Sequence, residues 1–175
     1  MTVKSVRSYQ DYKLYIAALT ANIEPQRGLQ FSVWCIGRFL KRFGEEYDLW
    51  DELEDGERAQ LEGIIAELET AILPTSERIV ALEATLSAVG PEAGEEYEDD
   101  YEELDSRAVT VIETVGCALA WCRTRDPSEL QAVSEHVVDA LDFEQTDSDY
   151  TTANMFTYPD LRAELEMQTA FLQRA

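Results

Sequence analysis

The stretch PQRGLQFSVWCIGRFLKRF, residues 25–43, decides the fold that the sequence predicts. Its apolar residues recur at helical spacing and cover most of a helix's circumference, as in a helix buried on several sides. Pro25 suits a first helical turn, Gly44 suits the position after the last, and Lys41 and Arg42 complement the helix dipole. We therefore expect a central helix here. Its apolar positions are Leu29, Phe31, Trp34, Cys35, Ile36, Phe39, Leu40 and Phe43.

The same periodicity continues along the rest of the chain, and no stretch alternates apolar and polar residues as a strand does. Asp55 is expected to cap one helix that ends before Pro74 and points Ile72 inward, and Asp126 to cap another. Residues 143–157 are expected to form an extended loop. The sequence thus predicts an all-α fold, a single domain over residues 1–175 built as a bundle of about seven helices. The other expected helices cover about residues 6–21, 57–73, 76–89, 105–124, 127–141 and 158–175.

The net charge of −22 is concentrated in two segments. Residues 45–57 carry eight acids and residues 92–105 carry nine, without one base in either segment. The remainder of the chain has 19 acids against 14 bases. Nucleic acid and anionic membrane surfaces would repel such a molecule, so direct nucleic-acid binding and membrane binding are not expected. A basic protein is the expected partner.

Cysteine usage and hydropathy indicate a cytoplasmic protein. Cys35, Cys117 and Cys122 are an odd number without a CxxC pair, which argues against a disulfide framework. The N-terminal residues lack a hydrophobic signal core, and no run approaches the ~20 apolar residues of a membrane helix. The oligomeric state stays open.

No enzymatic motif stands out. His136 is the only histidine, so metal motifs with two histidines are excluded, and it is expected at a helix edge. The three cysteines are expected in the core rather than as nucleophiles. The stretch from Asp51 to Glu62 has the Gly of a calcium loop at Gly56, but Leu53 stands where a ligand is required. We expect no metal, no cofactor and no catalytic residue.

The two acidic segments are the predicted partner-binding surface. Packed like charges destabilise a helix, and an ordinary solvated face mixes both signs. Complementary charge speeds association with a basic partner, and Tyr and Trp supply contact area at small entropic cost. The predicted contact residues are Glu45, Glu46, Tyr47, Asp48, Trp50, Asp51, Glu52, Glu95, Glu96, Tyr97, Glu98, Asp99, Asp100, Tyr101, Glu102 and Glu103.

Core packing is the alternative explanation for the aromatic residues in these segments. Tyr97, Tyr101 and Leu104 are spaced to form one stripe of a helix, which could anchor that helix to the core. The same holds for Tyr47, Trp50 and Leu53. Packing does not explain the missing bases.

Three stretches, LQFSVWCIGRFLKRF, LDSRAVTVIETVGCAL with SELQAVSEHVVDAL, and YPDLRAELEMQTAFL, together resemble the bacterial YjaG-like helical family, a domain of unknown function. Asp105 matches the Asp that opens the later buried helix, and Glu164 and Gln168 match the polar pattern of the terminal helix. Gly37 departs from the family, which tends to have Glu before Arg38. The resemblance implies an all-helical fold with no established activity.

The resemblance also suggests a structural and a functional hypothesis. Arg38, on the central helix, is expected to pair with Asp105 or Glu164 inside the bundle. Relatives of this kind look like immunity proteins of bacterial toxin systems, so the expected function is neutralisation of a toxin with a basic surface. A DNA mimic that blocks a DNA-binding protein, and a carboxylate-based metal-binding protein or enzyme, remain as alternatives.

Overall fold

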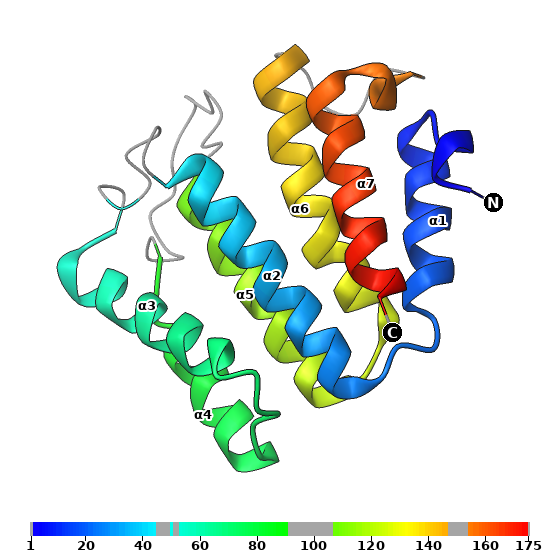
Figure 1. Ribbon diagram of the computed structural model, residues 1–175. Coiled ribbons are helices and arrows are strands. Elements are labelled where there is room, and N and C mark those ends of the chain that lie inside the picture. Colours follow the sequence, from blue (N-terminus) through cyan, green and yellow to red (C-terminus); the bar gives the residue numbers. More distant parts are fainter. Residues whose placement is uncertain (1, 45–49, 51–52, 91–106, 147–153, 175) are drawn as a thin grey trace.

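A computed structural model describes residues 2–44, 50, 53–90, 107–146 and 154–174. These residues form seven α-helices and no β-strand, which confirms the predicted all-α bundle (Figure 1). Two short 3-10 helices, Val3–Ser5 and Met155–Thr157, precede the first and last α-helices. The helices are α1 (Tyr9–Thr20), α2 (Pro25–Phe43), α3 (Asp55–Glu69), α4 (Ser76–Leu86), α5 (Arg107–Thr124), α6 (Pro127–Thr146) and α7 (Pro159–Gln173).

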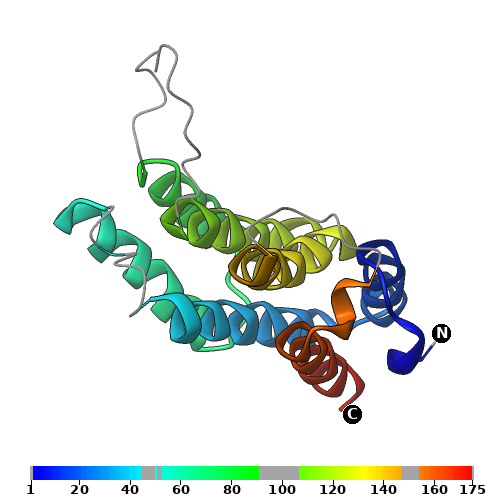
Figure 2. The ribbon, with the colours of Figure 1, turned by 90° about the horizontal axis from the view of Figure 1, so that it is seen from above.

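The helices form two layers, with α1 at one edge (Figure 2). One layer contains α3, α2 and α7, and the other contains α4, α5 and α6. Helix α2 packs against both α5 and α6, as expected for the central helix of the sequence. The largest side chains that are completely or almost completely buried include Tyr12, Phe31, Phe39, Phe43 and Phe156. Their burial joins α1, α2 and the chain before α7 into one hydrophobic core.

The Trp121 side chain of α5 packs directly against Gly28 of α2. A Cβ added to Gly28 would collide with the indole ring of Trp121. That ring cannot easily move, because it is 2% exposed and its Nε1 donates a hydrogen bond to the Pro25 carbonyl at 3.3 Å. Glycine at this position therefore lets the two helices pack together.

The variant Gly28→Ala should lower the free energy of unfolding by about 1–3 kcal/mol, since overpacking outweighs the better helix propensity of alanine. Gly37→Ala, in the same helix, is the matched control. Nothing lies within 4 Å of a Cβ added at Gly37, so this variant should gain about 0.5–1 kcal/mol. Urea unfolding followed by circular dichroism measures both changes. Equal stability of the two variants would contradict the packing account.

The turn between α3 and α4 differs from the expected one. Helix α3 ends at Glu69, and Ala71 adopts a left-handed conformation with φ 54°. The expected inward position of Ile72 is therefore wrong: its side chain is 71% exposed because the chain leaves the helix before reaching it. The expected Asp55 cap is also wrong. Glu54 is the capping residue, and the Glu57 carboxylate accepts from its backbone N–H at 2.9 Å.

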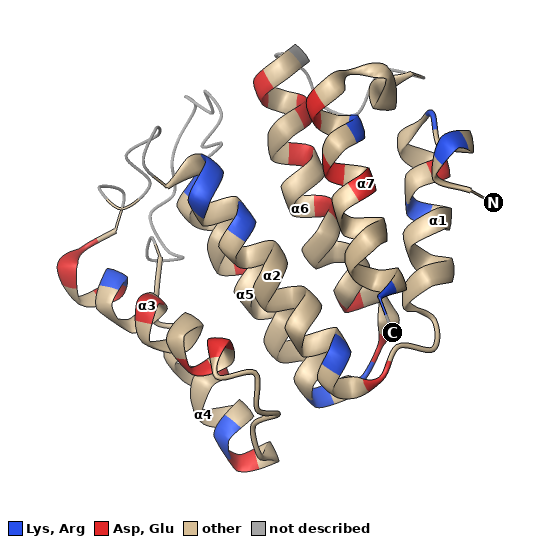
Figure 3. Ribbon diagram, viewed as in Figure 1, with Lys and Arg blue, Asp and Glu red and all other residues tan. Residues whose placement is uncertain are grey.

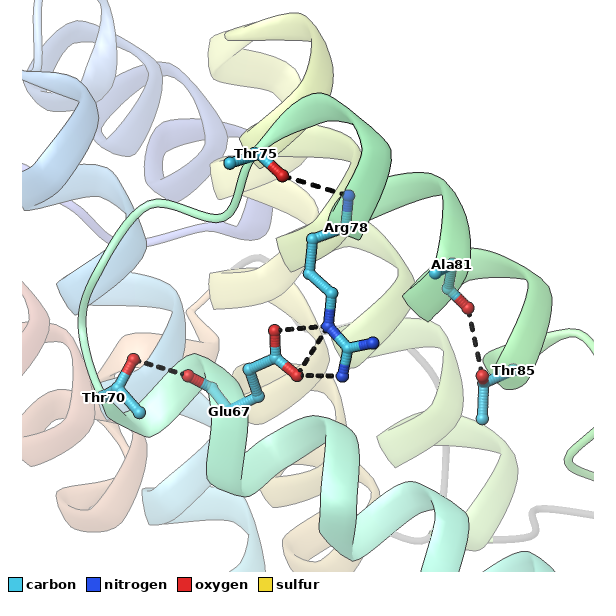
Figure 4. A network of polar contacts seen from close by, with 6 residues as sticks. All are labelled: Glu67, Thr70, Thr75, Arg78, Ala81 and Thr85. Carbon is cyan, nitrogen blue, oxygen red and sulfur yellow. Dashed lines mark hydrogen bonds and ion pairs between the residues drawn. The ribbon is translucent and has the colours of Figure 1, made fainter.

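A bidentate ion pair holds α3 and α4 together (Figure 4). The Arg78 Nε lies 2.7 Å from Glu67 Oε1, and its Nη2 donates to Oε2. The Thr75 hydroxyl accepts from the Arg78 backbone N–H at 3.3 Å and so caps α4. The hydrogen bonds from Arg78 lower the pKa of Glu67 below its usual value.

The Glu67→Gln variant should be less stable than the wild type at pH 7 and should lose that deficit in acid. Because the pKa of Glu67 is lowered in the folded state, its contribution is present above the unfolded pKa and disappears as the pH falls through the folded value. Urea unfolding at pH 7 and near pH 3 checks this. A deficit of the same size at both pH values would show that the carboxylate charge is not responsible.

The expected loop over residues 143–157 is also partly wrong. Helix α6 continues to Thr146, and Met155 and Phe156 are completely buried. Phe156 stacks on Tyr12 with ring centroids 5.2 Å apart. The start of α6 is as expected, because Asp126 Oδ1 accepts from the Ser128 backbone N–H at 2.9 Å.

Candidate functional site

Residues at the ends of the two acidic segments, or directly beside them, contact one another. The guanidinium of Arg107, directly after residues 91–106, lies 4.8 Å from the ring centroid of Phe43, two residues before Glu45. The Glu57 carboxylate, near the start of α3, accepts from the backbone N–H of Gly90 at 3.0 Å. The chain therefore enters and leaves both segments at neighbouring points of the bundle.

A third acidic segment begins near the same place. The Arg107 guanidinium lies 5.7 Å from the ring centroid of Phe143, in the last turns of α6. Asp147 and Asp149 follow that helix. A Cβ added to Gly90 would lie 3.4 Å from Ile112 Cδ1, which places Gly90 beside the first turns of α5. We call this part of the bundle, defined by Phe43, Gly90, Arg107 and Phe143, the acidic end.

The excess negative charge of the chain is attached mainly at the acidic end. Residues 45–49, 51–52, 91–106 and 147–153 hold 16 of the 36 acids and none of the 14 bases. The described residues hold the other 20 acids with all 14 bases, and both signs occur along the helices (Figure 3). Six ion pairs join described residues, so much of the bundle's own charge is internally balanced.

Of the predicted partner-binding residues, the structure describes Trp50. The others lie outside the described residues: Glu45, Glu46, Tyr47, Asp48, Asp51, Glu52, Glu95, Glu96, Tyr97, Glu98, Asp99, Asp100, Tyr101, Glu102 and Glu103.

Trp50 contacts the bundle itself. Its side chain is half-buried against the hydrophobic core, and the Arg58 guanidinium lies 5.0 Å from the ring centroid. Arg58 also pairs with Glu62 at 3.0 Å. Packing therefore accounts for Trp50, as it does for the buried Leu53 in the same stretch.

Three of the four predicted structural polar residues meet between α2 and α7. The Arg38 Nε and Nη2 lie 2.8 Å and 2.5 Å from Glu164 Oε2, and the Glu164 side chain is 1% exposed. The Gln168 amide donates to Glu164 Oε1 at 3.2 Å. Arg38 thus pairs with Glu164, while the alternative partner Asp105 lies outside the described residues.

The hydrogen bonds continue from this ion pair into α1 and α6. Tyr12 donates its hydroxyl proton to Gln168 Oε1 at 2.9 Å, and the Gln168 amide also donates to the Ser134 carbonyl at 3.3 Å. Burial raises the pKa of Tyr12 well above its usual value, so this hydroxyl stays protonated. The network positions four helices and leaves Tyr12 and Gln168 without access to a substrate, because both are completely buried.

Two of the three cysteines lie in the core as expected, and Cys117 is partly buried against it. Cys35 and Cys122 are buried, and burial raises the pKa of all three cysteines, that of Cys117 to about 11. A thiol with a raised pKa is protonated at neutral pH and is a poor nucleophile.

Sequence reasoning missed a polar cleft between α1, α5 and α6. His136, expected at a helix edge, lines it together with Tyr9, Arg107, Glu113, Glu135 and Asp139. The signal in the sequence is weak, because these residues come from three helices and form no motif within any one of them.

Neither a metal-binding cluster nor a membrane-spanning helix is found in the described parts of the chain. Among residues 2–44, 50, 53–90, 107–146 and 154–174, no group of three His, Cys, Asp or Glu side chains is arranged to hold a metal ion. Every helix within those ranges is too short or too polar to cross a membrane.

Comparisons with protein-family models, with curated proteins and with solved structures find no match to this chain. The resemblance to the YjaG-like family therefore stays a prediction, and the function must be inferred from the residues.

Proposed function

We propose that this protein is an immunity-type inhibitor that binds a toxin with a basic surface through its acidic segments. One observation carries the proposal: the segments that hold the uncompensated charge are attached at neighbouring points, through the contacts of Phe43 with Arg107 and of Glu57 with Gly90. Charges tethered at one end of a small bundle act on the same partner surface. Carboxylates gathered in this way attract a basic protein over a longer distance than scattered ones do.

The proposed mechanism is occlusion. A nuclease or another enzyme that acts on nucleic acid presents cationic side chains to substrate phosphates. Carboxylates of the acidic segments would occupy those side chains and keep the substrate away. The bundle supplies the support, and its helices are joined by a buried hydrogen bond and an ion pair, Tyr12–Gln168 and Arg38–Glu164.

A DNA mimic is the second candidate. Duplex DNA carries about one charge per 1.7 Å of helix axis, so a mimic needs its carboxylates in a continuous strip. The neighbouring attachment points of the acidic segments favour such a strip over two separate patches. The two candidates differ in the partner, which is a toxin in the first and a host DNA-binding protein in the second.

Capture on the immobilised intact protein, followed by elution with salt, tests the proposal. A basic enzyme that acts on nucleic acid and loses its activity in the complex is the expected result. A DNA-binding protein without toxic activity would instead indicate the DNA mimic. Retention of a neutral or acidic protein, by contacts that salt does not weaken, would contradict both.

A further inference from the structure

The cleft between α1, α5 and α6 has the size of a small-ligand site. Its volume is about 330 Å³, within the range of ligand pockets. Tyr9, Arg107, Glu113, Glu135, His136 and Asp139 line it. It reaches the acidic end at Arg107 and Phe143, and its described lining residues come from α1, α5 and α6.

Hydrogen bonds fix the orientation and the tautomer of His136. The Thr114 hydroxyl donates its one proton to the Thr110 carbonyl at 2.6 Å, so it accepts from the imidazole Nδ1, 2.8 Å away. Nδ1 therefore carries the proton of the neutral ring, and Nε2 carries a lone pair. Burial lowers the pKa of His136 from its ordinary value of 6.5, more than the nearby Glu113 and Glu135 raise it, so the ring is neutral at pH 7.

Hydrogen-bond acceptors dominate the rest of the lining. The Glu135 carboxylate accepts from the Tyr9 hydroxyl at 3.0 Å and pairs with Lys13 at 3.3 Å, both through Oε2. Glu113 is exposed on the neighbouring helix. The three carboxylates of the cleft exceed the two cations at its edge, Arg107 and Lys13, by one charge.

We propose that this cleft binds an alkylammonium or guanidinium cation of the size of a lysine or arginine side chain. An ammonium brings three N–H donors and a guanidinium five, and the cleft offers carboxylate oxygens and the Nε2 lone pair to receive them. The aromatic ring of Tyr9 gives the alkyl chain an apolar neighbour. The cation comes either from a basic side chain of a protein partner or from a free amine.

Nitrogen-15 NMR of the imidazole tests this directly, because His136 is the only histidine and gives one set of signals. Titration with n-butylammonium or n-butylguanidinium should shift the Nε2 resonance, with a dissociation constant of about 1–10 mM for so small a ligand. A bound cation should also lower the pKa of His136 further. Butyrate and n-butanol are the anionic and neutral control ligands.

The variant Glu113→Gln should weaken binding of n-butylammonium about 3- to 10-fold, since one charge is removed from the cleft wall. Glu113 is exposed, so the fold should persist. Glu77→Gln removes one exposed charge from α4 and should leave the titration unchanged. An imidazole spectrum that the cations do not change, or that n-butanol changes equally, overturns the proposal.

Two further ligands separate the sources of the cation. Nα-acetyl-lysine methylamide should bind as well as n-butylammonium if the cleft takes a side chain from a protein. If the cleft admits free amines only, putrescine should bind and Nα-acetyl-lysine methylamide should not. These titrations report on His136 and need no captured protein partner. Their failure would therefore leave the proposed function standing, and loss of partner binding in segment variants would leave the imidazole titration unchanged.

Discussion

Arg38→Met should lower the free energy of unfolding by about 2–4 kcal/mol. The substitution leaves the Glu164 carboxylate, 1% exposed, without its cationic partner, and an uncompensated buried charge is strongly destabilising. This loss of stability is smaller than for a fully buried ion pair, because the Arg38 side chain is 32% exposed and water can approach the site.

Removal of the acidic partner should lower the free energy of unfolding by less than removal of Arg38. In Glu164→Gln the remaining guanidinium is partly hydrated and the new amide oxygen can still accept from it. The new NH2 group then faces the Gln168 amide, which is also a donor, so the loss should be about 1–2 kcal/mol. The double variant, Arg38→Met with Glu164→Gln, should be more stable than Arg38→Met. Urea unfolding monitored by circular dichroism gives all three values. Equal losses in the two single variants would show that burial of Glu164 does not decide the cost.

Reversal of four charges in one acidic segment should slow association with the captured partner at least about 10-fold at low salt. The variant is Glu98→Lys, Asp99→Lys, Asp100→Lys and Glu102→Lys. Steering depends on the local potential of the binding face, so the rate should also become less sensitive to ionic strength. Stopped-flow mixing at several salt concentrations measures both quantities.

The control variant makes the same change in total charge elsewhere. Glu24, Glu69, Glu77 and Glu166 are exposed, and a change of all four to Lys leaves both acidic segments intact. Glu24 and Glu69 lie at the opposite ends of α2 and α3 from the acidic segment between those helices. The association rate of this control variant should stay within about 3-fold of the wild-type rate, because salt screens the effect of distant charges on association. Equal slowing in both variants would mean that total charge, rather than the acidic end, governs association.

The sequence was sufficient to predict the helices but not the ends of all of them. Residues 25–43 have apolar side chains around most of the helix, which is a local property, and α2 has the expected bounds. The end of α3 depends on the left-handed turn at Ala71, which periodicity cannot reveal. Helix α6 continues past its expected end to Thr146, and Phe143 in its last turns lies close to the Arg107 guanidinium, a contact that periodicity cannot reveal.

Polar partners were harder to predict than apolar faces. The family resemblance suggests two candidate partners for Arg38, Asp105 and Glu164. The partner in the structure is Glu164, which is 126 residues away along the chain. The hydrogen bond from Tyr12 to Gln168 spans 156 residues. Such contacts depend on how helices are arranged in space, so no pattern within one helix indicates them. The same reason explains why the cleft around His136 was missed.

The acidic segments themselves were evident from composition, while their relation to one another was not. Two segments separated by the whole of α3 and α4 begin and end at neighbouring points only because the α3–α4 hairpin returns the chain to its starting place. Because the hairpin brings the chain back, the two acidic segments can form one binding face instead of two unrelated ones.

Capture from the same cell extract on four immobilised proteins shows whether the two acidic segments bind one partner together. These are the wild type, the control variant, the variant of residues 98–102 described above, and Glu45→Lys, Glu46→Lys, Asp48→Lys and Asp51→Lys. If the acidic segments form one binding face, the wild type and the control should retain the same basic protein, and each segment variant should lose it. Retention by either segment variant, or equal loss from the control, would contradict the account.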